Sequence, residues 1–115
     1  MKIFKIILIT IVILFIASCA PQKPVEQSSA TEASSTATVD ISDFAFVPDT
    51  ITIKRGGTVT WIQKDSVPHT VAIEGIPESP SLNQGDTWSY TLDKTGSYKY
   101  ICSIHPSMEG KIIVK

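Results

Sequence analysis

Hydrophobic and polar residues alternate with a period of two from residue 38 onward, and this pattern predicts β-strands. The strand-like runs are short, rich in β-branched and aromatic residues, and separated by turn residues such as Gly56-Gly57 and Gly96. No convincing helical periodicity is found in this part of the chain. The predicted strands span residues 38–46, 50–54, 58–63, 70–74, 87–92, 97–102 and 111–115.

This succession of short strands and turns favours an all-β fold, a Greek-key β-sandwich, with a closed barrel as the alternative. In the strand at residues 97–102, alternation places Tyr98, Tyr100 and Cys102 on the same face. The strand that fills the core therefore carries a cysteine at its end. Tyr98 either forms a tyrosine corner with nearby backbone or is a half-buried aromatic residue.

The start of the chain has a different pattern. Lys2 and Lys5 precede an apolar run at residues 6–17, which is followed by small residues, and this is typical of a secretory signal. The run is shorter than the ~20 apolar residues that a transmembrane helix needs, so we expect export rather than a retained membrane helix. Residues 1–18 are therefore expected to be a lipoprotein-type signal peptide, on the evidence of the cysteine that follows them.

The sequence Ile16-Ala17-Ser18-Cys19 resembles the lipobox of bacterial lipoproteins. The resemblance implies that Cys19 is lipidated and becomes the first residue of the mature chain; the alternative is an ordinary cleavage site with a chance cysteine. Residues 19–37 are polar with almost no large apolar side chain, so we expect them to be the lipidated cysteine and a flexible tether. We expect residues 38–115 to be one domain, periplasmic or on the outer face of the cell membrane and lipid-anchored.

The charge pattern argues against nucleic acid as a partner. The formal net charge is −1, and acidic and basic residues are scattered without runs. The chain has two cysteines, which in an exported protein are expected to pair. A disulfide between Cys19 and Cys102 is disfavoured because Cys19 precedes the tether and Cys102 has a more demanding role.

That role is suggested by the donor atoms that follow the strand at residues 97–102. Cys102, His105 and Met108 place a thiol, an imidazole and a thioether at every third position. One thiolate and two imidazoles in a plane, with a weak axial thioether, form the geometry of type 1 copper. The only other histidine is His69, in a loop after Pro68. We therefore expect one copper ion bound by His69, Cys102, His105 and Met108.

The same residues resemble the cupredoxins, the type 1 blue copper proteins, of the plastocyanin and amicyanin group. The short ligand loop is most similar to that of amicyanin, and the similarity covers residues 38–115. The pattern consists of Cys102-x-x-His105-x-x-Met108, Pro68-His69, Gly96-x-Tyr98-x-Tyr100, Phe44-x-Phe46-x-Pro48 and the segment from Gly110 to Val114. The resemblance implies a Greek-key β-sandwich that transfers electrons and is not an enzyme, with one copper cycling between Cu(I) and Cu(II). It assigns His69, Cys102 and His105 as strong ligands and Met108 as the axial ligand.

This chain departs from the family pattern near the ligands. The family usually has asparagine after the first histidine, where it connects the two ligand loops, and this chain has Thr70. A threonine hydroxyl reaches less far, which affects loop rigidity and redox potential. Ile104 and Ser107 stand where amicyanin-like loops have proline and an aromatic residue, and we expect them to tune the site.

Two other functions remain open. Cys102 could be a nucleophile with His105 or His69 as its base, although a nucleophile needs an open cleft. The chain could also be a copper carrier or sensor that does no redox work. A visible Cu(II)–thiolate absorption band that bleaches reversibly on reduction would separate an electron carrier from a colourless Cu(I) carrier.

The expected partners are a redox donor and a redox acceptor protein. The resemblance implies that electrons enter through His105, at an apolar surface formed here by Val67, Pro68, Ile104 and Pro106. Such a patch suits transient complexes, and those of redox proteins often bury under about 1,200 Å². We expect the domain to act as a monomer and the chain to contact the membrane through its lipid anchor.

Overall fold

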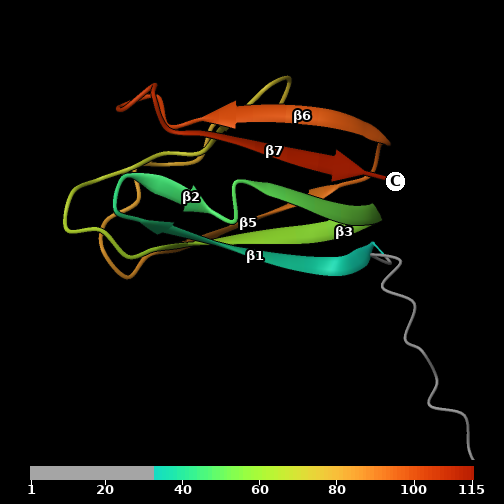
Figure 1. The fold of residues 1–115 in the computed structure, drawn as a ribbon, viewed down its shortest axis with the longest axis horizontal. Helices are drawn as coiled ribbons and strands as arrows, with labels where there is room; N and C mark the ends of the chain where they lie inside the picture. The colour runs from blue at the N-terminus through green and yellow to red at the C-terminus, as the bar shows by residue number, and fades with distance from the viewer. Residues whose placement is uncertain (1–32) are drawn as a thin grey trace, which may run out of the picture.

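The computed structural model describes residues 33–115, which form two layers of β-strands (Figure 1). The hydrogen-bonded order is β2-β1-β3-β7-β6-β4, and β5 also pairs with β3. No helix occurs among the described residues, and the predicted all-β fold class is confirmed. The strands are β1 (Ser34–Ser42), β2 (Ala45–Val47), β3 (Thr50–Gln63), β4 (Ala72–Ile73), β5 (Thr87–Leu92), β6 (Gly96–Ile101) and β7 (Glu109–Val114).

Strand β3 connects the two layers. Its first residues, 50–53, pair with β7, and residues 57–62 pair with β5. Residues 58–63 pair with β1, which also pairs with Ile53 through Ser34. Gly56, with a φ of 81°, lies at the change of partner, where a residue with a Cβ would be strained. The glycine pair predicted a turn between two strands here. Residues 50–63 are assigned as one strand, but Figure 1 shows β3 doubling back, with its first half parallel to β7 and its second half parallel to β1, so the expected turn is present.

The first predicted strand, residues 38–46, was wrong in its bounds. It is two antiparallel strands, because Asp43 and Phe44 adopt left-handed φ values of 51° and 56° and reverse the chain between β1 and β2. Strand β1 also begins at Ser34, upstream of the expected domain start at residue 38. It pairs in parallel with β3, which extends the layer toward the N-terminus of the domain.

The core lies between the layers and is built from alternating residues of the strands. Trp61 of β3, Tyr100 of β6 and Ile112 of β7 are at most 1% exposed. Complete burial of each such side chain stabilises the fold by roughly 1.5–3 kcal/mol or more. The further residues of this cluster include Val39, Ile41, Phe46, Ile53, Val59, Leu92 and Val114.

Strand β6 has the alternation that the sequence predicted. Tyr100 and Cys102 are buried and Tyr98 is half-buried on the same side, whereas Lys99 and Ile101 are exposed. The Tyr98 hydroxyl donates to the backbone carbonyl of Lys94 at 2.7 Å, which is a tyrosine corner. Strand β6 therefore anchors the core while it delivers Cys102 to one end of the sandwich.

The predictions for the signal peptide at residues 1–18, for Cys19 and for the tether up to residue 32 lie outside the described residues. Within residues 33–115, no helix long and apolar enough to span a bilayer was found. Cys102 is a free, buried thiol.

Candidate metal centre

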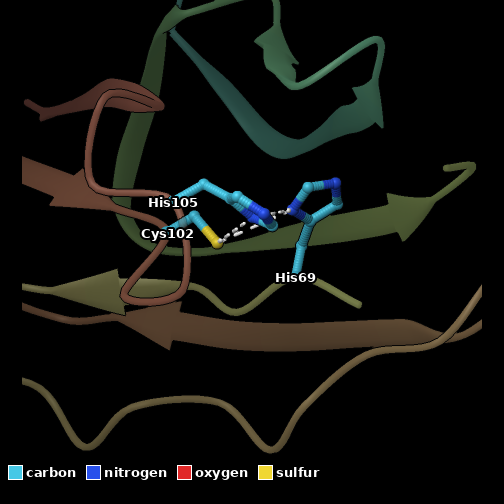
Figure 2. A group of neighbouring side chains, drawn as sticks. All are labelled: His69, Cys102 and His105. Carbon is cyan, nitrogen blue, oxygen red and sulfur yellow. Dashed lines mark hydrogen bonds between the residues drawn. The ribbon is translucent and has the colours of Figure 1, made fainter. Parts of the chain in front are cut away.

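Three donor side chains converge at one end of the sandwich (Figure 2). Cys102 directly follows β6, and His105 lies in the short loop between β6 and β7. His69 comes from a distant segment, where it forms an isolated antiparallel bridge with Leu82. Reciprocal backbone hydrogen bonds between His69 and Leu82, at 3.1 and 2.8 Å, hold that segment in place.

The donor atoms are close enough to share one ion. Cys102 Sγ lies 3.6 Å from His69 Nδ1 and 3.9 Å from His105 Nδ1, and the two imidazole nitrogens are 3.2 Å apart. An ion at the centre of such a triangle, with bonds of roughly 2.0 Å to nitrogen and 2.3 Å to sulfur, separates its donors by about 3.5 Å. The triangle therefore has the dimensions of a trigonal metal site.

Burial and backbone hydrogen bonds make this site rigid. His69 and Cys102 are 0% exposed, and His105 is only partly buried. The amide of Cys102 donates to the carbonyl of Met108 at 3.1 Å, and the amide of Met108 donates to the carbonyl of His105 at 2.9 Å. The Met108 side chain is 2% exposed. The structure thus brings His69, Cys102 and His105 together, and Met108 lies in the hydrogen-bonded loop that also carries Cys102 and His105.

Asp65 orients His69, although its role was not predicted from the sequence. The Asp65 Oδ2 atom accepts from His69 Nε2 at 2.8 Å, so Nδ1 faces the other donors. Burial raises the pKa of the Asp65 carboxyl, but hydrogen bonds from the amide of Phe44, the His69 ring and the amide of Asp43 outweigh it and lower the pKa below 3.8. In the sequence, Asp65 stands four residues before His69. That spacing predicts a side-chain contact only in a helix, and this segment is a loop, so the sequence alone did not indicate the hydrogen bond.

Thr70 connects the two ligand loops despite its short side chain. Its hydroxyl accepts from the amide of Ser103 at 2.9 Å and lies 2.7 Å from the Ser103 hydroxyl. Its own amide points at Cys102 Sγ, 3.4 Å away. The Ser103 hydroxyl in turn donates to Glu78. Thr70 thus links the two ligand loops at the position where the family usually has asparagine. Its shorter side chain is sufficient because Ser103 lies close to it.

Phe44 is a second residue that sequence reasoning did not place at the site. Its ring meets His69 at 5.4 Å and His105 at 5.2 Å between centroids, edge-on in both cases. The Phe44 residue is 53% exposed, so it forms part of the surface over the histidines. Only the left-handed turn between β1 and β2 brings it there.

The metal centre is separate from the surface hollow of about 410 Å³ on β6 and β7. Its lining contains none of the four predicted ligands; it includes Asp49, Glu74, Lys99, Tyr100 and Lys111. Cys102 is sealed in the core, whereas a nucleophile needs access to a substrate. The geometry therefore favours metal binding over nucleophilic catalysis.

The donor set fits copper. One thiolate and two imidazoles in a triangle, with a buried methionine in the same loop, match the preferred surroundings of a type 1 site. Imidazole and thiolate also accept zinc, but zinc prefers a tetrahedral set of strong ligands. The residues present can therefore hold one copper, which supplies the one-electron chemistry.

Comparison with known proteins agrees with this geometry. Residues 6–114 match the family described as "Cupredoxin-like domain". The chain is 35% identical over 83 residues to Amicyanin-alpha of Methylorubrum extorquens, covering 67% of this chain and 70% of that protein. It is 36% identical over 90 residues to the chloroplastic plastocyanin of Chlamydomonas reinhardtii, covering 66% of this chain and 62% of that protein.

Solved structures are similar as well. A reduced Cu(I) form of an amicyanin mutant at pH 4 superposes with a TM-score of 0.66 at 30% identity, covering 75% of this chain and 88% of that one. A copper-containing nitrite reductase from Thermus scotoductus has a TM-score of 0.64 at 30% identity, but this chain covers only 22% of it. The chain belongs to the cupredoxin family, and its cofactor is one type 1 copper.

Proposed function

We propose that this chain is an extracytoplasmic electron-transfer protein whose single copper cycles between Cu(I) and Cu(II). His69, Cys102 and His105 are the strong ligands, and Met108 is the axial ligand. The observation that carries the proposal is the triangle of donor atoms already assembled within 4.8 Å of one another in a buried, hydrogen-bonded site. A site that needs little rearrangement suits an ion that changes only its charge.

Electrons enter and leave through His105, the one strong ligand that is not fully buried. The surface around it is apolar: Ile104 is 48% exposed and Phe44 is 53% exposed. Pro68 and Pro106 are exposed nearby in sequence, and Val67 is partly buried. A donor and an acceptor redox protein dock transiently on this face, which buries a small area per complex. The domain works as a monomer and is not an enzyme.

The second candidate is a copper carrier that hands its ion to another protein. Carriers exchange ligands with their partners, which requires accessible donors. His69 and Cys102 are 0% exposed here, so a partner cannot reach them without opening the site. This burial favours electron transfer over metal delivery.

Adding Cu(II) to the purified protein tests the function. We expect an intense visible thiolate-to-copper band and a type 1 electron paramagnetic resonance signal, both lost reversibly on reduction. The Cys102→Ser variant should lose the band completely, because serine offers no comparable donor. A blue band that persists in Cys102→Ser would contradict the assignment, and a wild-type protein that holds only colourless Cu(I) would favour the carrier.

Zinc is the necessary control in this experiment. It binds imidazole and thiolate without colour, so overexpressed protein can carry it silently. Metal analysis of each preparation before copper is added separates a zinc-filled site from one that cannot bind copper.

The location rests on the leader and Cys19. We propose that Cys19 is lipidated and holds the domain at the outer face of the membrane or in the periplasm, as the lipobox pattern suggests. Cys19→Ser should move the protein into the soluble fraction of its native host when the leader is still removed, because several acyl chains provide the stable attachment. A processed variant that stays on the membrane would contradict lipidation at Cys19.

A further inference from the structure

Asp65 binds three groups that belong to different parts of the chain. Its Oδ2 atom accepts from His69 Nε2 at 2.8 Å and from the amide of Phe44 at 3.0 Å, and its Oδ1 atom accepts from the amide of Asp43 at 2.7 Å. The Asp65 side chain is only 13% exposed. One carboxylate therefore joins a proposed copper ligand to the turn between β1 and β2.

That turn has an unusual backbone. Asp43 and Phe44 both adopt left-handed φ values, 51° and 56°, which residues other than glycine rarely do. In this conformation the two successive amides both reach the Asp65 carboxylate. The charge-assisted hydrogen bonds stabilise a conformation that is otherwise unfavourable for Phe44.

The turn directs the Phe44 ring against both imidazoles. Its plane is at 87° to the His69 ring and 88° to the His105 ring, and edge-to-face pairs at these centroid distances of 5.4 and 5.2 Å are attractive. The two imidazoles lie 5.0 Å apart. Phe44 remains 53% exposed, so burial of its ring in the core does not explain its position.

We propose that Asp65 and Phe44 act as one clamp that positions both histidines for copper. An ionised carboxylate only accepts hydrogen bonds, so His69 carries its proton on Nε2 and presents the Nδ1 lone pair to the metal. Phe44 then restricts the tilt of His69 and His105 from the solvent side. The proposal deepens the proposed function and rests on it only in naming these histidines as ligands.

The clamp acts on the reaction by limiting rearrangement. A ligand ring that is fixed by hydrogen bonding on one side and by an aromatic ring on the other changes its orientation little when the ion gains or loses an electron. Asp65 and Phe44 are positioning residues, since neither is itself a metal ligand in the proposed site.

The first test uses the full chain without metal, observed by nitrogen NMR of the histidine rings. Wild-type His69 should show protonated Nε2, unprotonated Nδ1, and an Nε2 proton that exchanges slowly with water. Asp65→Asn should weaken or abolish that slow exchange and mix the two tautomers. Asp40→Asn is the matched control, because Asp40 pairs with Lys64 at 2.7 Å on the surface. An Asp65→Asn spectrum identical to wild type would overturn the proposal.

The second test measures zinc affinity of the full chain with Zn(II) alone. Residues that orient a ligand typically change metal affinity by about 10–100-fold, and we expect a loss of about tenfold for Asp65→Asn and a smaller loss for Phe44→Leu. Val47→Ala is the control for Phe44→Leu, because Val47 is exposed to a similar extent, 52%, on β2. A Phe44→Leu protein that matches Val47→Ala would remove Phe44 from the clamp.

The double variant tests whether the two residues form one unit. If Asp65 holds Phe44 in place, the Asp65→Asn and Phe44→Leu variant should lose less affinity than the product of the two single losses. Losses that simply multiply would show two independent contacts and contradict the clamp. The NMR and zinc results do not depend on copper colour, so a failure of the clamp and a failure of the proposed electron carrier are separate outcomes.

Discussion

At the scale of single residues, Cys102 has two roles that the β-strand makes compatible. Alternation along β6 places it on the core side with Tyr100, and its position directly after the strand leaves the sulfur at the end of the sandwich. Burial excludes water from the thiol while two imidazole nitrogens lie within 3.9 Å. The Cys102 side chain therefore packs at the end of the core and also supplies the sulfur donor of the metal site.

The proposed role of Met108 as axial ligand depends on its thioether sulfur rather than on its size. Met108→Leu conserves size and apolar character, so the fold should remain and the blue colour should survive, because the thiolate is still present. The reduction potential should rise, since losing a donor destabilises Cu(II) more than Cu(I). Voltammetry of the two proteins measures this. An unchanged or lower potential would argue against axial ligation by Met108.

At the scale of elements, the two ligand segments are joined by the short β4–β6 ladder and, beyond its end, by polar side-chain contacts. The Thr70 hydroxyl meets the amide of Ser103 at 2.9 Å, and Ser103 donates to Glu78 on the segment that follows β4. These bonds link the loop after β6 to the chain around His69. The loops can therefore remain short and irregular while the donor atoms stay in register.

Glu78 makes this connection sensitive to pH. Hydrogen bonds from Ser103 and Thr70 lower the pKa of Glu78 below 4.5, so the ionised group contributes stability at neutral pH and loses it as pH falls through the folded-state pKa. Glu78→Gln should be less stable than wild type at neutral pH, and the difference should vanish in acid well below pH 4.5. Denaturant unfolding at the two pH values measures both quantities.

Glu109→Gln is the control for this prediction. Glu109 is an exposed carboxylate at the start of β7, near the same end of the sandwich. We expect the Glu109 variant to differ little from wild type at either pH, because exposed charges away from such contacts usually change stability by about 0.5 kcal/mol or less. A Glu78→Gln deficit that persists in acid would contradict the role of the ionised carboxylate.

At the scale of the whole molecule, Tyr100 connects the layers. Its ring packs against Phe46 of β2 at 4.6 Å and against Trp61 of β3 at 5.6 Å between centroids. A Cβ at Gly110 of β7 would overlap the Tyr100 ring, so only glycine fits opposite it. The sandwich therefore closes around one aromatic side chain, two residues before the copper cysteine.

This burial predicts the response of the fold to alkali. Burial raises the pKa of Tyr100 to about 12 from 10.0, so the neutral ring contributes stability that is present below pH 10 and lost as pH rises toward 12. The loss should reach about 2–3 kcal/mol for the roughly two-unit shift. In Tyr100→Phe, which has no hydroxyl to ionise, the free energy of unfolding should fall much less over the same pH range. The Tyr100 hydroxyl has no partner among residues 33–115, so the change should cost little at neutral pH.

Tyr90→Phe provides the comparison in the same unfolding series. Tyr90 is half-buried on β5 and packs on Trp88 at 5.7 Å. If Tyr90→Phe flattened the alkaline loss as much as Tyr100→Phe, or if neither did, the explanation from burial of Tyr100 would be wrong.

Periodicity along the chain was enough to predict the sandwich and the position of Cys102. Alternate side chains of a strand point into the core, so a hydrophobic period of two predicts both the all-β fold class and which face of β6 is buried. The ligand set followed from inventory, because the chain has only two histidines and Cys102 is its only cysteine beyond Cys19. His69, Cys102 and His105 were therefore predicted from the sequence to share one site, and the structure places them together.

Tertiary structure decided what surrounds those ligands. Periodicity did not reveal the break at Asp43 and Phe44, because a left-handed turn depends on the Asp65 carboxylate that comes from a distant loop to bind both amides. Phe44 looked like one more apolar residue of a strand, and the structure places it against two imidazoles. Donor atoms are a property of composition and spacing, which the sequence displays. Their orientation depends on contacts between segments with no fixed spacing, which only the folded chain creates.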